Sequence, residues 1–229
     1  MIESRHIKAV TLDVDGTLYD IRWMVLRNIL VMFPVLDFFR DLHKVRDGMR
    51  KEGHFSDFRK EQARRLAKIR GIRHGQASRQ VEEVIDNRWG KAFRAIKPYK
   101  GVETTLAEFH KRGVRLGLVS DYPLEYKIKG LRLGGLPFET KIVTERVGAL
   151  KPHPAAFERA AAELGLDPGL VLHVGDREDC DVEGALKAGM KTALFSRKAR
   201  KQESRANIVF SDWRKLIQLL EDADMLTTI

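Results

Sequence analysis

Residues 8–19, Lys-Ala-Val-Thr-Leu-Asp-Val-Asp-Gly-Thr-Leu-Tyr, are a short apolar run that ends in two carboxylates, Asp13 and Asp15, followed by Gly16 and Thr17. Residues two apart in a strand point to the same face, so a strand that ends here aims both carboxylates at one small volume. Two such charges repel each other unless a cation lies between them or one of them is protonated. The stretch therefore predicts a buried strand that leads into a metal and phosphate site.

The chain after about Gly101 alternates between short apolar runs and helix-like stretches, several of which stop at a glycine. The expected strands are residues 114–120, 138–144, 170–174, 191–195 and 208–210. The expected helices are 102–112, 123–133, 154–164, 178–188 and about 212–220. Strands separated by helices of this length imply a parallel sheet with helices on both faces. We therefore predict an α/β fold.

Residues 21–97 have a different pattern, because their apolar side chains recur at helical spacing, as at Val81, Ile85 and Ala92. Pro98 disfavours helix at the residue before it and marks a joint. We predict that residues 1–20 and 98–229 form the α/β core and that residues 21–97 are an all-helical insertion. Its most apolar part, residues 21–39, is interrupted by charged residues, Asn28 and Pro34, which favours a buried helix over a membrane span.

The positive charge of the chain is concentrated in this insertion. The formal net charge is +10, and residues 21–97 carry 19 Lys or Arg against 9 Asp or Glu. A field of that sign attracts anions, whether a phosphate ester, a nucleic acid or a membrane surface. Cys180 is the only cysteine, and the N-terminal residues lack the apolar core of a signal peptide, so a reducing, cytoplasmic location is expected.

Polar residues also follow three later strands, at the points where those strands end. They are Ser120 with Asp121, Lys151 just before a helix, and Asp176 with Asp181 five residues on. The carboxyl ends of parallel strands meet at one edge of a sheet, where ligands bind in open α/β folds. We expect these side chains to lie together with Asp13 and Asp15.

Four motifs resemble the haloacid-dehalogenase-like hydrolase superfamily. They are Leu12-Asp13-Val14-Asp15-Gly16-Thr17-Leu18, Leu118-Val119-Ser120-Asp121, Gly148-Ala149-Leu150-Lys151-Pro152-His153-Pro154, and Val174-Gly175-Asp176 through Asp181 to Gly189-Met190. The resemblance covers the whole chain in order and implies a Rossmann-like core. Within the superfamily, the chain is similar to phosphoglycolate phosphatase-like enzymes, which carry a helical cap after the first strand. It resembles the dehalogenases less, because they lack the second acid, here Asp15.

The resemblance implies a Mg²⁺-dependent phosphatase that acts on a small phosphorylated metabolite. Asp13 would be the nucleophile that forms an aspartyl phosphate, and Asp15 the general acid and base. The Mg²⁺ ligands would be the Asp13 carboxylate, the Asp15 backbone carbonyl and Asp176, with Asp181 supporting through water. The phosphate oxygens would be held by Ser120, Lys151 and the backbone N–H groups near Gly16, Thr17 and Asp121.

Other interpretations stay open from the sequence. Ser120 has a rival role in capping a turn, and Asp181 in capping a helix. Arg177 and Cys180 stand where the family often has a small hydroxyl residue and Asn. A phosphomutase of the same superfamily is one alternative function. A protein that uses the basic insertion to bind nucleic acid or an anionic surface is another, less favoured because every catalytic acid is present. The substrate and the oligomeric state are left open.

Overall fold

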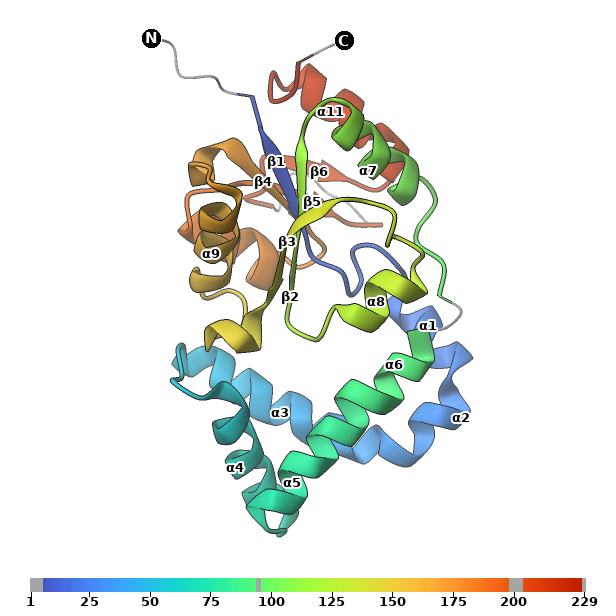
Figure 1. The fold of residues 1–229 in the computed structure, drawn as a ribbon, viewed down its shortest axis with the longest axis vertical. Coiled ribbons are helices and arrows are strands. Elements are labelled where there is room, and N and C mark those ends of the chain that lie inside the picture. The colour runs from blue at the N-terminus through green and yellow to red at the C-terminus, as the bar shows by residue number, and fades with distance from the viewer. Residues whose placement is uncertain (1–5, 94–95, 198–203, 228–229) are drawn as a thin grey trace.

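The computed structural model describes residues 6–93, 96–197 and 204–227, and its centre is one parallel sheet of six strands (Figure 1). The strands are β1 (Ala9–Leu12), β2 (Arg115–Ser120), β3 (Phe138–Val143), β4 (Val171–Gly175), β5 (Lys191–Phe195) and β6 (Ile208–Phe210). They lie in the order β3-β2-β1-β4-β5-β6, so β1 pairs with β2 on one side and with β4 on the other. The predicted Rossmann-like α/β fold is confirmed.

Helices pack on both faces of the sheet. Ala9 of β1 packs in one apolar cluster with α9 (Ala155–Leu164) and α10 (Glu183–Lys187). The next residue, Val10, belongs to a second cluster with α7 (Val102–Lys111) and α11 (Leu216–Asp222). Every residue of β1 and of β4 is buried, as expected for strands covered on both sides. The residues that follow β1 and β4 are therefore attached to strands that are packed on both faces.

The strands predicted after Gly101 are all present, with ends that differ from the prediction by at most one residue. The predicted helices differ more in detail. The helix expected over 123–133 is shorter, α8 (Glu125–Gly130). The one expected over 178–188 begins as a π-helical turn, Glu178–Val182, before α10. A 3₁₀ turn, Trp213–Lys215, precedes α11, and two others, Thr144–Val147 and Pro168–Leu170, lie after β3 and before β4.

The described residues between β1 and α7 include helices and no strand of the sheet. They contain α1 (Ile21–Arg27), α2 (Ile29–Met32), a 3₁₀ turn (Phe33–Val35), α3 (Leu36–Glu52), α4 (Phe58–Arg70), α5 (His74–Val81), a π-helical stretch (Glu82–Arg88) and α6 (Trp89–Ala92). Local caps set the ends: the Asp57 carboxylate accepts from the Lys60 N–H at 2.9 Å, and Gly71 ends α4 at φ 63°. These helices gather at one end of the molecule (Figure 1).

The prediction of a buried helix over residues 21–39 is wrong. Asn28 ends α1 with a non-helical backbone, φ −105° and ψ 22°, and its side-chain amide donates to the Met24 carbonyl at 2.8 Å and to the Ala92 carbonyl at 3.2 Å. Met24 and Phe38 are buried, but Leu30 is 88% exposed and Phe33 is 71% exposed. Only part of the apolar surface thus packs against the core. In the described parts of the chain, no helix combines the length and apolarity needed to cross a membrane.

The difference in exposure predicts a large loss of folding stability when one leucine is truncated and a small one when another is. Leu42 in α3 is fully buried, so Leu42→Ala should lower the free energy of unfolding by about 2–5 kcal/mol. Leu30→Ala should change it by less than about 0.5 kcal/mol. Urea unfolding followed by circular dichroism measures both values, and a loss of similar size in the two variants would contradict the exposed position of Leu30.

Candidate active site

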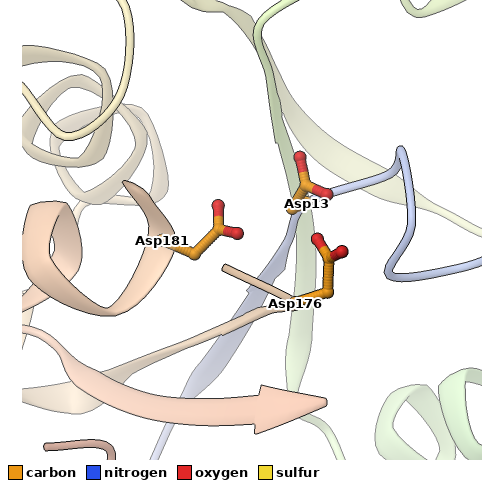
Figure 2. A group of neighbouring side chains, drawn as sticks. All are labelled: Asp13, Asp176 and Asp181. Carbon is orange, nitrogen blue, oxygen red and sulfur yellow. The ribbon is translucent and has the colours of Figure 1, made fainter. Parts of the chain in front are cut away.

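The site lies where the strand order reverses, at the carboxyl ends of β1 and β4, which is where open α/β sheets bind ligands. Asp13 directly follows β1, and its N–H donates to the Val174 carbonyl of β4 at 2.9 Å. Asp176 directly follows β4. Figure 2 shows the carboxylates of Asp13, Asp176 and Asp181 converging, and one oxygen of each lies within 4.8 Å of the others. The predicted juxtaposition of these three acids is therefore present.

The turn after Asp13 is fitted tightly against Asp176. Gly16 adopts φ +95°, and a Cβ atom there would lie 2.3 Å from Asp176 Oδ2. Both facts require glycine at this position. The buried Thr17 hydroxyl donates to Asp13 Oδ2 at 2.9 Å and lies 3.2 Å from Asp176 Oδ1. The Trp213 indole N–H donates to the Thr17 carbonyl at 3.2 Å, which links this turn to the 3₁₀ turn before α11.

Lys151 is buried among the acids. Its ammonium donates to Asp13 Oδ1 at 2.5 Å and to Asp181 Oδ1 at 2.7 Å. One cation therefore faces three carboxylates, which leaves two negative charges when all are ionised. Burial is the main cause that raises the pKa of Asp13 to about 8 and that of Asp176 to about 6. An excess of buried negative charge on oxygen donors suits a divalent cation such as Mg²⁺.

Both oxygens of Asp181 have partners. Oδ2 accepts from the Arg177 backbone N–H at 3.0 Å, and Oδ1 lies 3.5 Å from His173 Nε2 as well as near Lys151. Burial by itself would raise the pKa of Asp181, but Lys151 and His173 outweigh it and the pKa is lowered. Asp181 thus caps the turn that begins the helix and also anchors Lys151. Our sequence interpretation missed His173, although a lone histidine in an apolar strand was a usable signal.

Asp15 and Ser120 are joined by a lysine that our sequence interpretation also missed. The Lys127 ammonium of α8 donates to Asp15 Oδ2 and, at 2.9 Å, to Ser120 Oγ. Tyr19, likewise missed, donates its hydroxyl to Asp15 Oδ1 at 2.6 Å. Ser120 Oγ also accepts from the Tyr122 N–H at 3.3 Å, so the turn-capping role considered from the sequence is present too. No spacing in the sequence distinguishes Lys127 from nearby lysines.

Two arginines of α3, one turn apart, reach the loop after β2. Arg50 donates to Asp121 Oδ2 at 3.0 Å and to the Lys151 carbonyl. Arg46 donates to the Asp121 carbonyl, and its guanidinium lies 4.2 Å from the centroid of the Tyr122 ring. Burial alone would raise the pKa of Asp121, but Lys151, Arg50 and Arg46 lower it. The helical segment therefore contacts the site directly.

Arg46 also makes a buried ion pair with Glu145, which follows β3, at 3.2 Å. Its side chain is 2% exposed and that of Glu145 is 3% exposed. Breaking such a pair by removing one partner is expensive, because the other charge stays buried. This pair fixes α3 against the sheet.

The two departures from the family motif lie at the edge of the site. The Arg177 guanidinium is half-exposed and pairs with Asp179 at 2.6 Å. Cys180 is a buried free thiol, and burial raises its pKa to about 12. Cys180 therefore packs as a small apolar side chain that stays protonated at neutral pH.

A pocket of about 630 Å³ opens beside Gly16 and Asp176. Its other lining residues include Arg22, Tyr99 and Arg197. The volume is within the usual range for small-molecule sites. Of the three acids of the cluster, Asp176 lines this pocket, so a ligand of metabolite size that occupies it would meet the cluster at Asp176.

The model of the haloacid dehalogenase-like hydrolase family matches residues 7–189. The chain belongs to this family, as the sequence motifs indicated, and is an enzyme of the hydrolase class. Among curated relatives, glyceraldehyde 3-phosphate phosphatase of Methanopyrus kandleri is 31% identical over 207 residues, which cover 83% of this chain and 84% of the relative. Pyrophosphatase PpaX of Halalkalibacterium halodurans is 34% identical over 103 residues, 44% of this chain and 47% of the relative.

Solved structures share the fold. A 2-haloacid dehalogenase from Pseudomonas syringae matches with a TM-score of 0.70 at 22% identity, and the match covers 94% of this chain and 99% of the dehalogenase chain. A phosphatase of the family from Thermococcus onnurineus has a TM-score of 0.61 at 22% identity, with 93% and 98% covered. Both enzyme classes thus use this architecture, so the fold alone does not choose between them.

The raised pKa of Asp13 predicts how stability changes with pH in the absence of metal. The folded protein keeps this proton up to about pH 8, whereas the ordinary pKa is 3.8. Between these values the folded state binds more protons than the unfolded chain, so raising the pH lowers the free energy of unfolding. Asp13→Asn removes this titration. From pH 5 to pH 8, the free energy of unfolding of Asp13→Asn should therefore rise relative to wild type by about 1–4 kcal/mol.

Urea unfolding with a chelator present measures this difference. Asp179→Asn is the matched control, because Asp179 is exposed and its pKa is lowered by Arg177. The control should show no trend with pH between 5 and 8. A difference between Asp13→Asn and wild type that does not depend on pH would contradict the prediction.

Proposed function

We propose that this protein is a Mg²⁺-dependent phosphatase that hydrolyses a small phosphate monoester through an aspartyl phosphate on Asp13. The observation that carries the proposal is the cluster of buried Asp13, half-buried Asp176 and buried Asp181, in which the Lys151 ammonium pairs with Asp13 and Asp181. The presence of Asp15, the acid that the dehalogenases lack, supports phosphatase over dehalogenase chemistry. The phosphatase names of the curated relatives agree with this choice.

The donor set fits a magnesium ion. Asp13, Asp176 and Asp181 offer carboxylate oxygens, and their charges together with Lys151 leave an excess of two negative charges for a divalent cation to balance. The proposed ligands are the Asp13 and Asp176 carboxylates and the Asp15 backbone carbonyl, with Asp181 supporting through water. When bound, Mg²⁺ neutralises charge on the phosphate and on the attacking carboxylate.

The residues of the chain then have distinct roles in two displacements. An oxygen of Asp13 attacks phosphorus while Asp15 gives a proton to the leaving oxygen, which produces an alcohol and an aspartyl phosphate. Asp15 next takes a proton from water, whose oxygen attacks phosphorus and releases Asp13 and inorganic phosphate. Thr17 and Lys151 orient Asp13 through the hydrogen bonds described above.

The phosphate oxygens need donors in both steps. We assign these to Ser120, Lys151 and the backbone N–H groups near Gly16, Thr17 and Asp121. Ser120 and Lys151 are buried, so they act where water does not weaken their interactions. Ser120 lies at the end of β2, Lys151 lies shortly before α9, and Gly16 follows β1, so three chain segments surround the phosphate.

We further infer that residues 21–97 form a cap over a catalytic core of residues 1–20 and 98–229. Support comes from the helical content of the segment and from the contacts of Arg46 and Arg50 with Asp121. A cap of this kind encloses the substrate and selects it. The substrate we propose is a small phosphorylated metabolite, in keeping with the size of the pocket and with the relatives named above. A cytoplasmic site of action is consistent with the single buried thiol, Cys180.

Part of the basic surplus of residues 21–97 is neutralised by acids outside the segment. Arg46 and Arg59 pair with Glu145, and Arg50 pairs with Asp121. Each pair removes part of the charge that would contact phosphates. The small phosphate ester is therefore the substrate class that we favour.

A direct test uses p-nitrophenyl phosphate with and without Mg²⁺. Wild type should hydrolyse it in the presence of Mg²⁺ and lose the activity with a chelator. Asp13→Asn should lower kcat at least about 10⁴-fold, because an amide oxygen is a poor nucleophile toward phosphorus. Asp179→Asn, which changes an exposed acid near the site, should keep wild-type activity.

The same assay, extended to a panel of phosphorylated metabolites and ranked by kcat/KM, identifies the substrate. Wild-type turnover by Asp13→Asn would remove Asp13 as the nucleophile. Activity that is unaffected by a chelator would remove the metal from the proposal.

A further inference from the structure

Lys127 is a buried cation at the site to which none of the steps above gives a role. It lies in α8 and is fully buried, whereas Lys129, two residues on, is exposed. A buried ammonium is costly unless it is paired and hydrogen-bonded. Here the partners are Asp15 Oδ2 and Ser120 Oγ, and the ammonium also lies 5.5 Å from the centroid of the Tyr122 ring. The packing of α8 thus delivers one positive charge to two residues of the proposed chemistry.

The second oxygen of Asp15 is also held. The Tyr19 hydroxyl donates to Oδ1, and burial followed by the charge of Asp15 raises the pKa of Tyr19 well above its ordinary value, so this hydroxyl keeps its proton. Both oxygens of the Asp15 carboxyl group therefore have a hydrogen-bond partner. Tyr19 is neutral, so Lys127 is the partner that supplies charge.

We propose that Lys127 is a positioning residue for proton transfer: it orients Asp15 and stabilises the carboxylate that remains after the proton has passed to the leaving oxygen. The inference rests on the proposed phosphatase function. The bond that breaks is the O–H bond of Asp15, the bond that forms is the O–H bond of the product alcohol, and the negative charge left on Asp15 faces Lys127. Through Ser120, the same ammonium ties the acid to a donor of the phosphate site.

This role predicts a dependence on the leaving group. An alkyl phosphate needs a proton on its leaving oxygen, whereas p-nitrophenolate leaves with little help, so general acid catalysis matters mainly for the alkyl ester. Lys127→Met should lower kcat/KM for ethyl phosphate at least about 100-fold, and for p-nitrophenyl phosphate less than about 10-fold. Lys129→Met, the matched control on the same helix, should leave both values unchanged.

A second pair of variants separates action through Asp15 from a general structural role. Asp15→Asn alone should show the same leaving-group pattern. The double variant Asp15→Asn with Lys127→Met also removes the unpaired charge that could impair folding of Lys127→Met. If Lys127 acts through Asp15, the double variant should hydrolyse ethyl phosphate at the rate of Asp15→Asn, within about 3-fold.

The outcomes are distinct. Equal losses on both substrates in Lys127→Met, or a further large loss in the double variant, would overturn the proposal and leave Lys127 with a structural role. No loss in Lys127→Met would overturn it as well. Failure of the wild-type protein to hydrolyse either ester would instead remove the proposed function, on which the inference rests.

Discussion

The arrangement of the site depends on the ammonium of Lys151, a single buried positive charge shared by Asp13 and Asp181. Asp13 follows β1, and Asp181 lies in the helical turn after β4. Without a cation between them, their repulsion would keep one of them protonated. Lys151 also contributes its backbone: its N–H lies 3.3 Å from Asp121 Oδ1, and its carbonyl accepts from Arg50. One residue thereby connects the acids, the loop after β2 and the helix α3. The strand order, which sets β1 beside β4, makes this sharing possible.

The contacts of α3 add a second level of organisation. Arg46 and Arg50 do not touch the acids of the cluster; they hold the Asp121 loop and the carbonyl of Lys151. A shift of α3 would therefore move the groups that we assign to the phosphate oxygens, not only the walls around a substrate. This connection is specific because the Arg46 and Glu145 side chains are buried, so water cannot solvate either charge if the pair separates. If residues 21–97 form the cap that we propose, α3 would couple substrate selection to phosphate binding.

The sequence was most informative where chemistry and local pattern coincide. The ends of β2 to β6 were predictable because apolar runs stop at glycine or polar residues, and the meeting of Asp13, Asp176 and Asp181 followed from the geometry of parallel strands. The order of the strands, by contrast, depends on pairings between distant segments that no local pattern records. Lys127, Arg46 and Arg50 were missed for a related reason: burial distinguishes them from other basic residues, and burial is a property of the packed chain. The exposed face of residues 21–39 was missed because apolar composition indicates burial without showing what is available to cover it.

Gly16 shows how little freedom such a site leaves to evolution. A single methyl group at this position would occupy the space of an Asp176 oxygen, so even the most conservative replacement displaces an acid of the cluster. Gly165 has a similar left-handed backbone but open space around it, so a side chain there would cause backbone strain without a steric clash. In a library of variants, alanine at position 165 would cost a modest amount of folding stability. Alanine at position 16 would displace Asp176 and so abolish activity. We therefore expect substitutions at position 16 to be very rare among members of this family.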